Sequence, residues 1–313
     1  LPRPAGYAAV AVAEAVAQAG YAPAEPWPGA LVYATNFGGQ QDWWDATDPA
    51  RRVAGLDYHT AAAATAAQGL VVTLSNACSS GTQALGHAAD LVRLGVCDQA
   101  IACGFDELGL FCLSGLSILH TITTDTIRPF DRRRSGVIAS EGATVAVLES
   151  AAAAAARGAR ARARLLGAWG GCDPSAPPLG WGRDPARLAA TARRGLTRHG
   201  ATPAAIDRVV AAAAGTPAGD RLEAGMLRAL FPERLPPVLA PKGTLGEFGG
   251  GLLAAAILAA GGEASWPTAG FAEPDPALAL VPHDGTPLPA PRLVFATALA
   301  VAGGAAWALL SPP

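Results

Sequence analysis

The pattern of apolar and polar positions changes period repeatedly along this chain. Ala and Val recur at helical spacing over residues 5–19 and again over 78–94, which predicts two amphipathic helices. Short apolar runs predict strands at 31–35, 70–74, 98–103 and 143–149. Helices are also predicted near 59–67 and, as a short connection, at 151–156. This alternation of strands and helices indicates an α/β protein with mainly parallel sheets.

The same order of elements starts again after residue 157. Strands are predicted at 161–169, 207–213, 237–240, 292–298 and 305–310, and helices at 185–199, 218–231 and 249–260. We therefore expect two similar halves, residues 1–156 and 157–313. The first half shows one strand fewer and begins directly at a helix, so it is expected to lack its opening strand. We expect a partner subunit or a remodelled loop to cover the backbone groups left unpaired.

Composition narrows the class of protein. Of the 313 residues, 51% are hydrophobic and 15% charged, so a large core is available and whole-chain disorder is excluded. The net charge of −2 argues against a nucleic-acid binder, and no apolar run has the length of a membrane span. Five cysteines form no CxxC pair and no metal-binding spacing, which favours reduced thiols in a cytoplasmic protein with no metal and no cofactor.

Cys78 is the first candidate for chemistry. It lies in residues 75–82 (SNACSSGT), where a predicted strand ends and a predicted helix begins. A thiol in the first turn of a helix is shifted towards thiolate by the helix dipole. Small neighbours would let a substrate carbonyl approach backbone N–H groups, which could stabilise an oxyanion. The alternative is a small buried residue in a tight turn, and Cys97, Cys103 and Cys112 are interpreted as core.

Lys242 is the second candidate, because every other basic side chain apart from histidine is arginine. A compact ammonium can fit a tight site that a guanidinium cannot. Chance retention of one lysine is the competing interpretation.

Four segments in order resemble the β-ketoacyl synthases, the thiolase-fold condensing enzymes of fatty acid and polyketide synthesis. The segment from Ala77 (ACSSGTQALGHAADLVRLGVCDQAIACGFDEL) resembles their nucleophile region, and residues 128–149 (RPFDRRRSGVIASEGATVAVLE) resemble the segment that runs from Pro-Phe-Asp to Glu-Gly-Ala. Residues 214–231 (AGTPAGDRLEAGMLRALF) resemble the segment after the first catalytic histidine, and 241–257 (PKGTLGEFGGGLLAAAI) the segment with the conserved lysine and the second histidine.

The resemblance implies a duplicated thiolase-like α-β-α-β-α fold, a dimer, and an acyl carrier protein as partner. It implies catalytic roles for Cys78, Lys242 and Glu247, which should face one another across one pocket. It also implies substrate contacts and two residues that brace loops near the site. The substrate contacts are Ser79, Thr216, Gly303 and Gly304, and the bracing residues are Asp131 and Glu141.

Both catalytic histidines of the family are missing. The first corresponds to Ala212 and the second to Glu247, and the C-terminal Gly-Phe-Gly-Gly turn reads Val301-Ala302-Gly303-Gly304. Alanine cannot donate a hydrogen bond to an enolate, and a carboxylate repels a developing oxyanion. Decarboxylative condensation by this chain alone is therefore not expected.

Two hypotheses fit this pattern. In the first, the chain pairs with a competent ketosynthase subunit, as a chain-length factor does, and shapes the product tunnel. In the second, it is an independent acyltransferase or thioester hydrolase in which Cys78 carries the acyl group and Glu247 is the general base. We favour the first.

Overall fold

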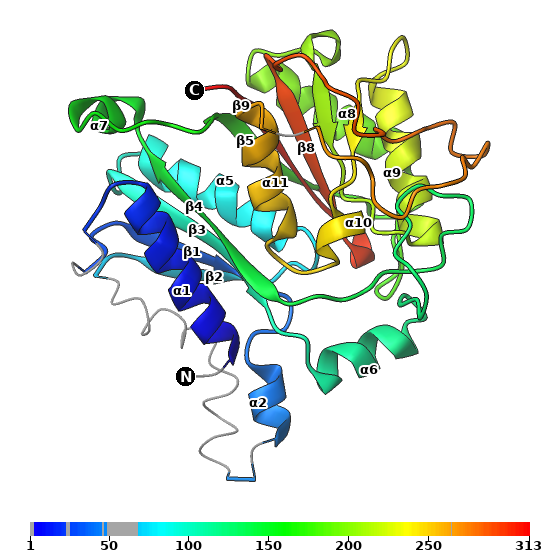
Figure 1. Ribbon diagram of the computed structural model, residues 1–313, viewed down its shortest axis with the longest axis horizontal. Coiled ribbons are helices and arrows are strands. Elements are labelled where there is room, and N and C mark those ends of the chain that lie inside the picture. The colour runs from blue at the N-terminus through cyan, green and yellow to red at the C-terminus, as the bar shows by residue number, and fades with distance from the viewer. Residues whose placement is uncertain (1–2, 23–25, 46, 49–67, 264) are drawn as a thin grey trace. The chain divides into compact units, whose positions relative to one another are not determined.

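The computed structural model describes residues 3–22, 26–45, 47–48, 68–263 and 265–313. The chain forms two compact units, each drawn in Figure 1. Unit 1 contains residues 1–115, 140–161 and 248–254, and unit 2 contains residues 116–139, 162–247 and 255–313. Residues 157–161 and 248–254 of the C-terminal half therefore belong to unit 1.

Unit 1 is built on a four-stranded sheet of order β2-β1-β3-β4. The strands are β1 (Ala30–Ala34), β2 (Val71–Leu74), β3 (Gln99–Asp106) and β4 (Gly142–Glu149). Strand β1 is parallel to β2 and β3, and β3 is antiparallel to β4. All five residues of β1 are buried, as expected for an apolar run in the middle of a sheet that is covered on both faces.

Helices α1 (Arg3–Gln18) and α5 (Ser80–Arg93) pack on this sheet (Figure 1). The apolar stripe of α1 forms one core with alternate residues of β1 and β3, among them Leu31, Tyr33 and Ile101. Because side chains alternate between the faces of a strand, these residues define one covered face of the sheet. Other described helices of the first half that lie wholly or partly in unit 1 are shorter: α2 (Gln40–Asp45), α6 (Leu110–Ile118) and α7 (Ala151–Ala156).

Unit 2 is built on a five-stranded sheet of order β5-β9-β8-β6-β7. The strands are β5 (Arg164–Cys172), β6 (Arg208–Val210), β7 (Val238–Leu239), β8 (Val294–Leu299) and β9 (Gly304–Ser311). Strand β6 is parallel to β7 and β8, whereas β9 is antiparallel to both β8 and β5.

The core of unit 2 joins this sheet to two long helices, α8 (Pro185–Arg198) and α9 (Pro217–Leu230). Leu196, Met226, Phe295 and Trp307 are fully buried in it. Among the described residues, the other elements are shorter: α10 (Lys242–Leu245), α11 (Gly251–Ala260), which begins in unit 1, and the 3₁₀ turns η1 (Pro203–Ala205) and η2 (Val301–Gly303).

Most predicted elements are confirmed, with shifted ends. The prediction that the first half has one strand fewer is confirmed among the described residues, since the sheets have four and five strands. The prediction of mainly parallel sheets is wrong, because antiparallel β4, β5 and β9 make both sheets mixed. The helix expected near 59–67 lies outside the described residues. Among the described helices, none combines the length and apolar character needed to cross a membrane.

Candidate active site

Cys78 lies in a strained turn between β2 and α5. The helix was expected to begin at residue 78, but α5 begins two residues later, at Ser80, with Ser79 as its N-cap. Ala77 has a positive φ of 46°, which is unfavourable for any residue with a Cβ. Cys78 itself is half-buried. It therefore precedes the helix rather than forming part of its first turn, and the helix dipole acts on it from just beyond the helix end.

Serine hydroxyls hold this turn in place. Ser79 Oγ donates to the Asn76 carbonyl at 2.8 Å, and Ser80 Oγ donates to the Ala77 carbonyl at 2.7 Å. Ser80 Oγ also accepts from the Asn76 N–H at 2.7 Å. Ser79, a predicted substrate contact, is fully buried, and its hydroxyl also accepts from Gln83 Nε2. Its hydrogen bonds are thus made inside the turn.

Glycines let segment 248–254 approach the start of α5. A Cβ on Gly81 would lie 2.3 Å from the Gly249 carbonyl oxygen, and a Cβ on Gly104 would lie 2.5 Å from the Cα of Gly250. Real Cβ atoms are not found this close to backbone atoms, so larger residues would force the backbones apart.

Asp106 is the buried anchor of the same region, and sequence reasoning missed it. Its carboxylate accepts from Asn36 N–H at 2.8 Å and from Gly249 N–H at 2.7 Å, besides Thr35 Oγ1, Asn36 Nδ2 and the Phe37 N–H. Burial raises the pKa of Asp106, and these donors oppose that rise. An acidic residue at the end of an apolar strand (residues 99–106) was the available signal.

Lys242 and Glu247 form a buried ion pair in unit 2. Lys242 Nζ donates to Glu247 Oε2 at 2.6 Å, and the two side chains are 2% and 11% exposed. Gly246 links them with a positive φ of 73°, and the Glu247 N–H donates to the Ile138 carbonyl at 2.9 Å. The other carboxylate oxygen, Oε1, is buried and accepts no hydrogen bond from the residues that the structure describes. Lys242 and Glu247, two of the three predicted catalytic residues, therefore lie in direct contact.

The alanine-rich segment 211–214, where the resemblance predicts the position of the first histidine, is held by two buried carboxylates. Glu223 accepts from the Ala212 N–H at 2.8 Å and from the Thr297 hydroxyl. Asp220 accepts from the N–H groups of Ala214 and Gly215 at 3.2 Å. These two acids thus fix the loop before α9 by direct hydrogen bonds, which is a larger role than the charge–dipole contact that their position in the helix suggests.

Burial dominates the electrostatics of both acids. It raises the pKa of Asp220 to about 7, although the Phe130 N–H, which donates to it at 2.7 Å, opposes the rise. Burial also raises the pKa of Glu223, and hydrogen bonds and the Lys242 charge act against it. Thr297, whose hydroxyl donates to Glu223, is, like Asp106, a residue that sequence reasoning missed.

A pocket opens beside this segment, wholly within unit 2. It is small, with a free volume of about 10 Å³, which is room for about one water molecule. The lining residues are Trp181, Ala212, Ala213, Ala214, Thr216, Gly219, Asp220, Glu223, Glu247 and Leu299. The predicted substrate contact Thr216 and the predicted catalytic Glu247 are thus brought to one pocket, with Trp181 as an unpredicted wall.

Gly303 and Gly304 lie elsewhere in unit 2, at the turn that leads into β9. Gly303 has a φ of 85°, and a Cβ there would lie 2.3 Å from the Asp173 carbonyl oxygen. Gly304 begins β9, and its carbonyl accepts from the Ala300 N–H at 2.8 Å. Neither glycine lines the pocket.

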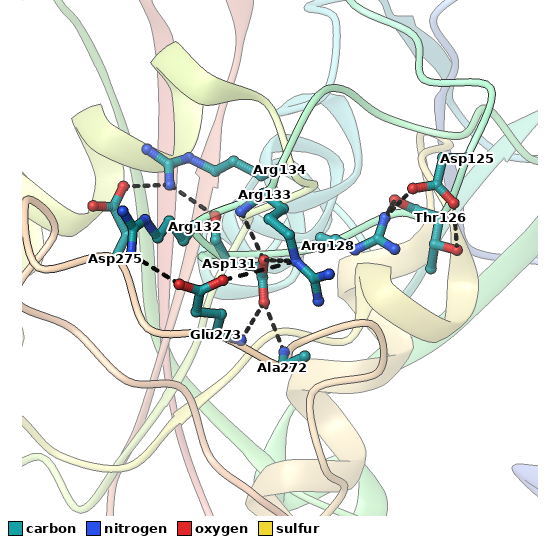
Figure 2. Close-up of polar contacts among 10 residues, drawn as sticks. All are labelled: Asp125, Thr126, Arg128, Asp131, Arg132, Arg133, Arg134, Ala272, Glu273 and Asp275. Atoms are coloured by element: carbon teal, nitrogen blue, oxygen red, sulfur yellow. Dashed lines mark hydrogen bonds and ion pairs between the residues drawn. The ribbon is translucent and has the colours of Figure 1, made fainter.

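Asp131 joins two loops of unit 2 (Figure 2). It is fully buried, and its Oδ2 accepts from the N–H groups of Ala272 and Glu273 at 2.7 and 2.6 Å. Burial works against ionisation, yet these donors and that of Arg133 together lower the pKa of Asp131. In unit 1, Glu141 accepts from the Leu108 N–H at 3.0 Å and pairs with Arg3.

The remaining cysteines are not equivalent. Cys103 and Cys112 are buried as predicted, and burial raises the pKa of Cys112 to about 12. The interpretation of Cys97 as core is wrong, because it is half-buried just after the end of α5. In the part of the chain that the structure describes, no group of three or more His, Cys, Asp or Glu side chains has a metal-binding arrangement.

Comparison with known proteins adds the family. Residues 5–154 match the family "Beta-ketoacyl synthase, N-terminal domain", and residues 181–260 match "Beta-ketoacyl synthase, C-terminal domain". Among curated relatives, an oxytetracycline polyketide putative β-ketoacyl synthase 1 of Streptomyces rimosus is 32% identical over 76% of this chain and 58% of its own length. Nodulation protein E of Rhizobium meliloti (strain 1021) is 31% identical over 86% of this chain and 72% of its own.

Solved structures agree. The ishigamide ketosynthase/chain length factor matches with a TM-score of 0.88 and 28% identity, over 100% of this chain and 83% of that one. A β-ketoacyl synthase from Burkholderia phymatum STM815 also has a TM-score of 0.88, with 25% identity over 99% and 82% of the two chains. These matches confirm the expected thiolase-like fold.

The chain spans somewhat less than three fifths of the length of the first two curated relatives it matches, 58% and 57%. The matched segments include Cys78 in the N-terminal domain and Lys242 and Glu247 in the C-terminal domain. From the two domain matches and the relatives together, the chain belongs to the β-ketoacyl synthase family.

Proposed function

We propose that this chain is a chain-length-factor-like subunit of fatty acid or polyketide biosynthesis, which pairs with a competent ketosynthase and does not itself carry out decarboxylative condensation. The observation that carries the proposal is the buried Lys242–Glu247 ion pair, 2.6 Å long, next to a pocket in which Ala212 stands at the position of the first histidine.

The charge in unit 2 has the wrong sign for condensation. Loss of malonyl carbon dioxide leaves an enolate, and acyl transfer passes through an oxyanion, so both steps need hydrogen-bond donors at the developing negative charge. The pocket lining includes Asp220, Glu223 and Glu247 and no imidazole. Loss of one oxyanion donor costs about 100- to 1000-fold in rate, and here two imidazoles are absent and a carboxylate is added.

The comparisons support the pairing. The solved structure that covers the whole of this chain at 28% identity is titled as a ketosynthase/chain length factor. A curated relative at 32% identity is titled as a polyketide putative β-ketoacyl synthase 1. We infer that this chain likewise works beside a synthase that acts on an acyl carrier protein.

The test is reconstitution with the ketosynthase encoded nearest to this chain's gene. We expect a heterodimer by mass, and malonyl decarboxylation only when the synthase is present. Replacing the nucleophilic cysteine of the synthase should abolish turnover, whereas Cys78→Ala in this chain should leave it unchanged. Decarboxylation by this chain alone, at a rate within about tenfold of the pair, would overturn the proposal.

A second candidate function is acyl transfer through Cys78. Its half-buried thiol in the turn before α5 favours it over a purely structural cysteine. In this reaction the Cys78 thiolate attacks an acyl thioester, the carrier thiol leaves, and water, an amine or an alcohol then displaces Cys78 while Glu247 accepts the proton.

Intact-protein mass spectrometry decides between the two candidates. Incubation with acyl carrier thioester should add one acyl group that Cys78→Ala abolishes and that the control Cys172→Ala, at an exposed cysteine, retains. The absence of an adduct, under conditions that load an active synthase, would leave only the partner function.

A further inference from the structure

We propose that helix α8 of unit 2 is a docking surface for a partner protein that presents a row of carboxylates on a helix. The surface consists of three arginines on the outer side of α8, Arg187, Arg194 and Arg198, which we call the arginine row. The inference concerns unit 2 alone and goes beyond the proposed function, because it holds whether or not this chain pairs with a ketosynthase.

The three arginines lie on one stripe of the helix. At about 100° per residue they fall within about 40° of one another around the helix axis, and at about 1.5 Å per residue they span about 16 Å along it. All three are exposed. The buried residues of α8, among them Leu188 and Leu196, lie on the other side and pack in the core of unit 2. The arginine row therefore faces away from the core along three turns of the helix.

Little negative charge balances the arginine row. Asp184, the N-cap of α8, lies 3.5 Å from the Arg187 guanidinium, and among the described residues it is the only carboxylate within ion-pair distance of the row. Arg194 donates to the Thr191 hydroxyl at 2.9 Å, which leaves its charge uncompensated. Three arginines and one aspartate leave a local charge of +2, in a chain whose net charge is −2.

The stability of α8 does not explain this arrangement. Like charges four residues apart on a helix, as at Arg194 and Arg198, repel each other. Arg187 lies in the first turn, where the helix dipole disfavours a cation. In unit 1, α1 precedes the corresponding central strand, and its charged residues are one arginine and one glutamate, Arg3 and Glu14. The fold does not require the row, and a carboxylate surface laid over it would relieve the repulsion.

The chemistry of the arginine row selects the class of partner. A guanidinium binds a carboxylate through two parallel hydrogen bonds, so carboxylates at the same spacing on a second helix would match the row. An anionic membrane is a poorer fit, because none of the exposed large apolar side chains of the described residues lies on α8, so nothing would insert between lipids. A nucleic acid is also a poorer fit, since a chain with a net charge of −2 lacks the overall basic field that such binding needs.

The experiment is a titration of a fluorescein-labelled helical peptide with the whole chain. The peptide consists of alanine and glutamine, with glutamates at positions i, i+4, i+7 and i+11, and the same peptide with glutamine at these positions is the comparison probe. By fluorescence anisotropy we expect saturable binding of the glutamate peptide, at least about tenfold tighter than that of the glutamine peptide. Raising the salt from about 20 mM to about 150 mM should weaken this binding several-fold, because salt screens exposed charges.

A triple variant locates the site. Replacing all three residues of the arginine row by glutamine should weaken binding of the glutamate peptide by about tenfold or more. The control makes the same change in charge at three exposed arginines that pair with acids elsewhere on unit 2: Arg132→Gln, Arg162→Gln and Arg292→Gln. It should bind within about twofold of the unmodified chain. Arg193 stays in both variants, because it donates to the Ala229 carbonyl at the end of α9 and so holds the two helices together.

Two further probes separate the classes of partner, vesicles of phosphatidylglycerol and a short DNA duplex. Both should bind more weakly than the glutamate peptide. Tighter binding of either one, lost in the variant of the arginine row, would overturn the proposal in favour of a membrane or a nucleic acid. Equal affinity for the two peptides, equal loss of binding in the two triple variants, or no saturable binding would each overturn it as well.

Discussion

The sheets of unit 1 and unit 2 have corresponding strand orders, but different interactions hold the loops beside them. Reading each sheet from its parallel edge gives β2-β1-β3-β4 in unit 1 and β7-β6-β8-β9-β5 in unit 2. In both, two parallel pairings are followed by an antiparallel one. Strand β5 is the extra member, so the position without a counterpart in unit 1 is the outer edge of β4.

The candidate residues occupy corresponding places in the two units. Cys78 follows β2 and precedes α5, and Lys242 follows β7 and precedes α11. Both are at the carboxyl end of a parallel edge strand, the position where open α/β sheets place their ligands. Each unit thus carries a candidate residue, Cys78 or Lys242, just after its parallel edge strand.

The difference lies in how buried acids are satisfied. In unit 1, Asp106 accepts only neutral donors, and glycines close the space between backbones. In unit 2, Glu247 accepts from one ammonium, and its other oxygen is buried without a partner among the described residues. At these two acids, unit 1 therefore relies on neutral donors and close backbone packing, whereas unit 2 relies on the charge of one ammonium.

The largest effect is expected from breaking the ion pair of unit 2. Lys242→Met keeps most of the side-chain volume but leaves the Glu247 charge buried without its partner. We expect the free energy of unfolding to fall by about 3–5 kcal/mol, measured by chemical denaturation.

The double variant Lys242→Met/Glu247→Leu is the control, because it removes both charges. It should recover most of the loss, since a hydrophobic pair of similar volume often replaces a buried ion pair without cost. A single variant as stable as the unmodified chain would show that unit 2 does not depend on this charge, and the contrast with unit 1 would fail.

The next largest effect tests the closed packing of unit 1. Gly104→Ala places a methyl group 2.5 Å from the Cα of Gly250, and we expect a loss of about 3 kcal/mol. Gly115→Ala in α6, where a Cβ meets nothing within 4 Å, is the matched control and should be neutral or slightly stabilising. Ala212→Val, in the small pocket of unit 2, should cost less than Gly104→Ala. If Ala212→Val cost more than Gly104→Ala, the tighter packing would lie in unit 2 rather than in unit 1.

Many helices and strands were predictable from the sequence, because an element with a buried face carries apolar residues at a regular spacing. The runs at 31–35 and 143–149 became β1 and β4 within one residue at each end. The unequal strand count followed from the same runs. Helices α2 and α6 were not predicted, because α2 is a short polar segment and α6 is apolar on all sides, so neither shows a helical stripe.

The site was predictable only where a motif marks it. The segments around Cys78, Thr216 and Lys242 could be placed by resemblance, and Thr216 and Glu247 line one pocket. That Cys78 faces Lys242 and Glu247 stays a prediction. Asp106 and Trp181 were missed because their roles depend on hydrogen bonds and walls formed by residues far away in the sequence, which spacing does not encode.

A further effect, spread over several pH units, is expected from the titration of Asp220. Burial raises its pKa to about 7, against about 3.9 in an unfolded chain. Between these values the native state binds a proton that the unfolded state has released, so stability falls as pH rises through this window, by about 1.4 kcal/mol per pH unit. Chemical denaturation of the unmodified chain and of Asp220→Asn from pH 4.5 to 8 measures this. The difference between them should fall with pH and level off above 7. A constant difference would mean that the backbone donors keep Asp220 ionised throughout this range.

The smallest effect is expected from an exposed ion pair, which separates burial from charge pairing as the cause of the Lys242 effect. Arg132 pairs with Glu273 at 2.9 Å, but the two side chains are 62% and 45% exposed (Figure 2). Water and salt screen such a pair, and holding two long side chains together costs entropy, so Arg132→Gln should change the free energy of unfolding by about 0–1 kcal/mol.

Arg134→Gln is the matched comparison in the same loop, because Arg134 is 4% exposed and pairs with Asp275 at 2.7 Å. It should cost more than Arg132→Gln and resist added salt. Equal effects at both positions would indicate that pairing itself, rather than burial, stabilises unit 2.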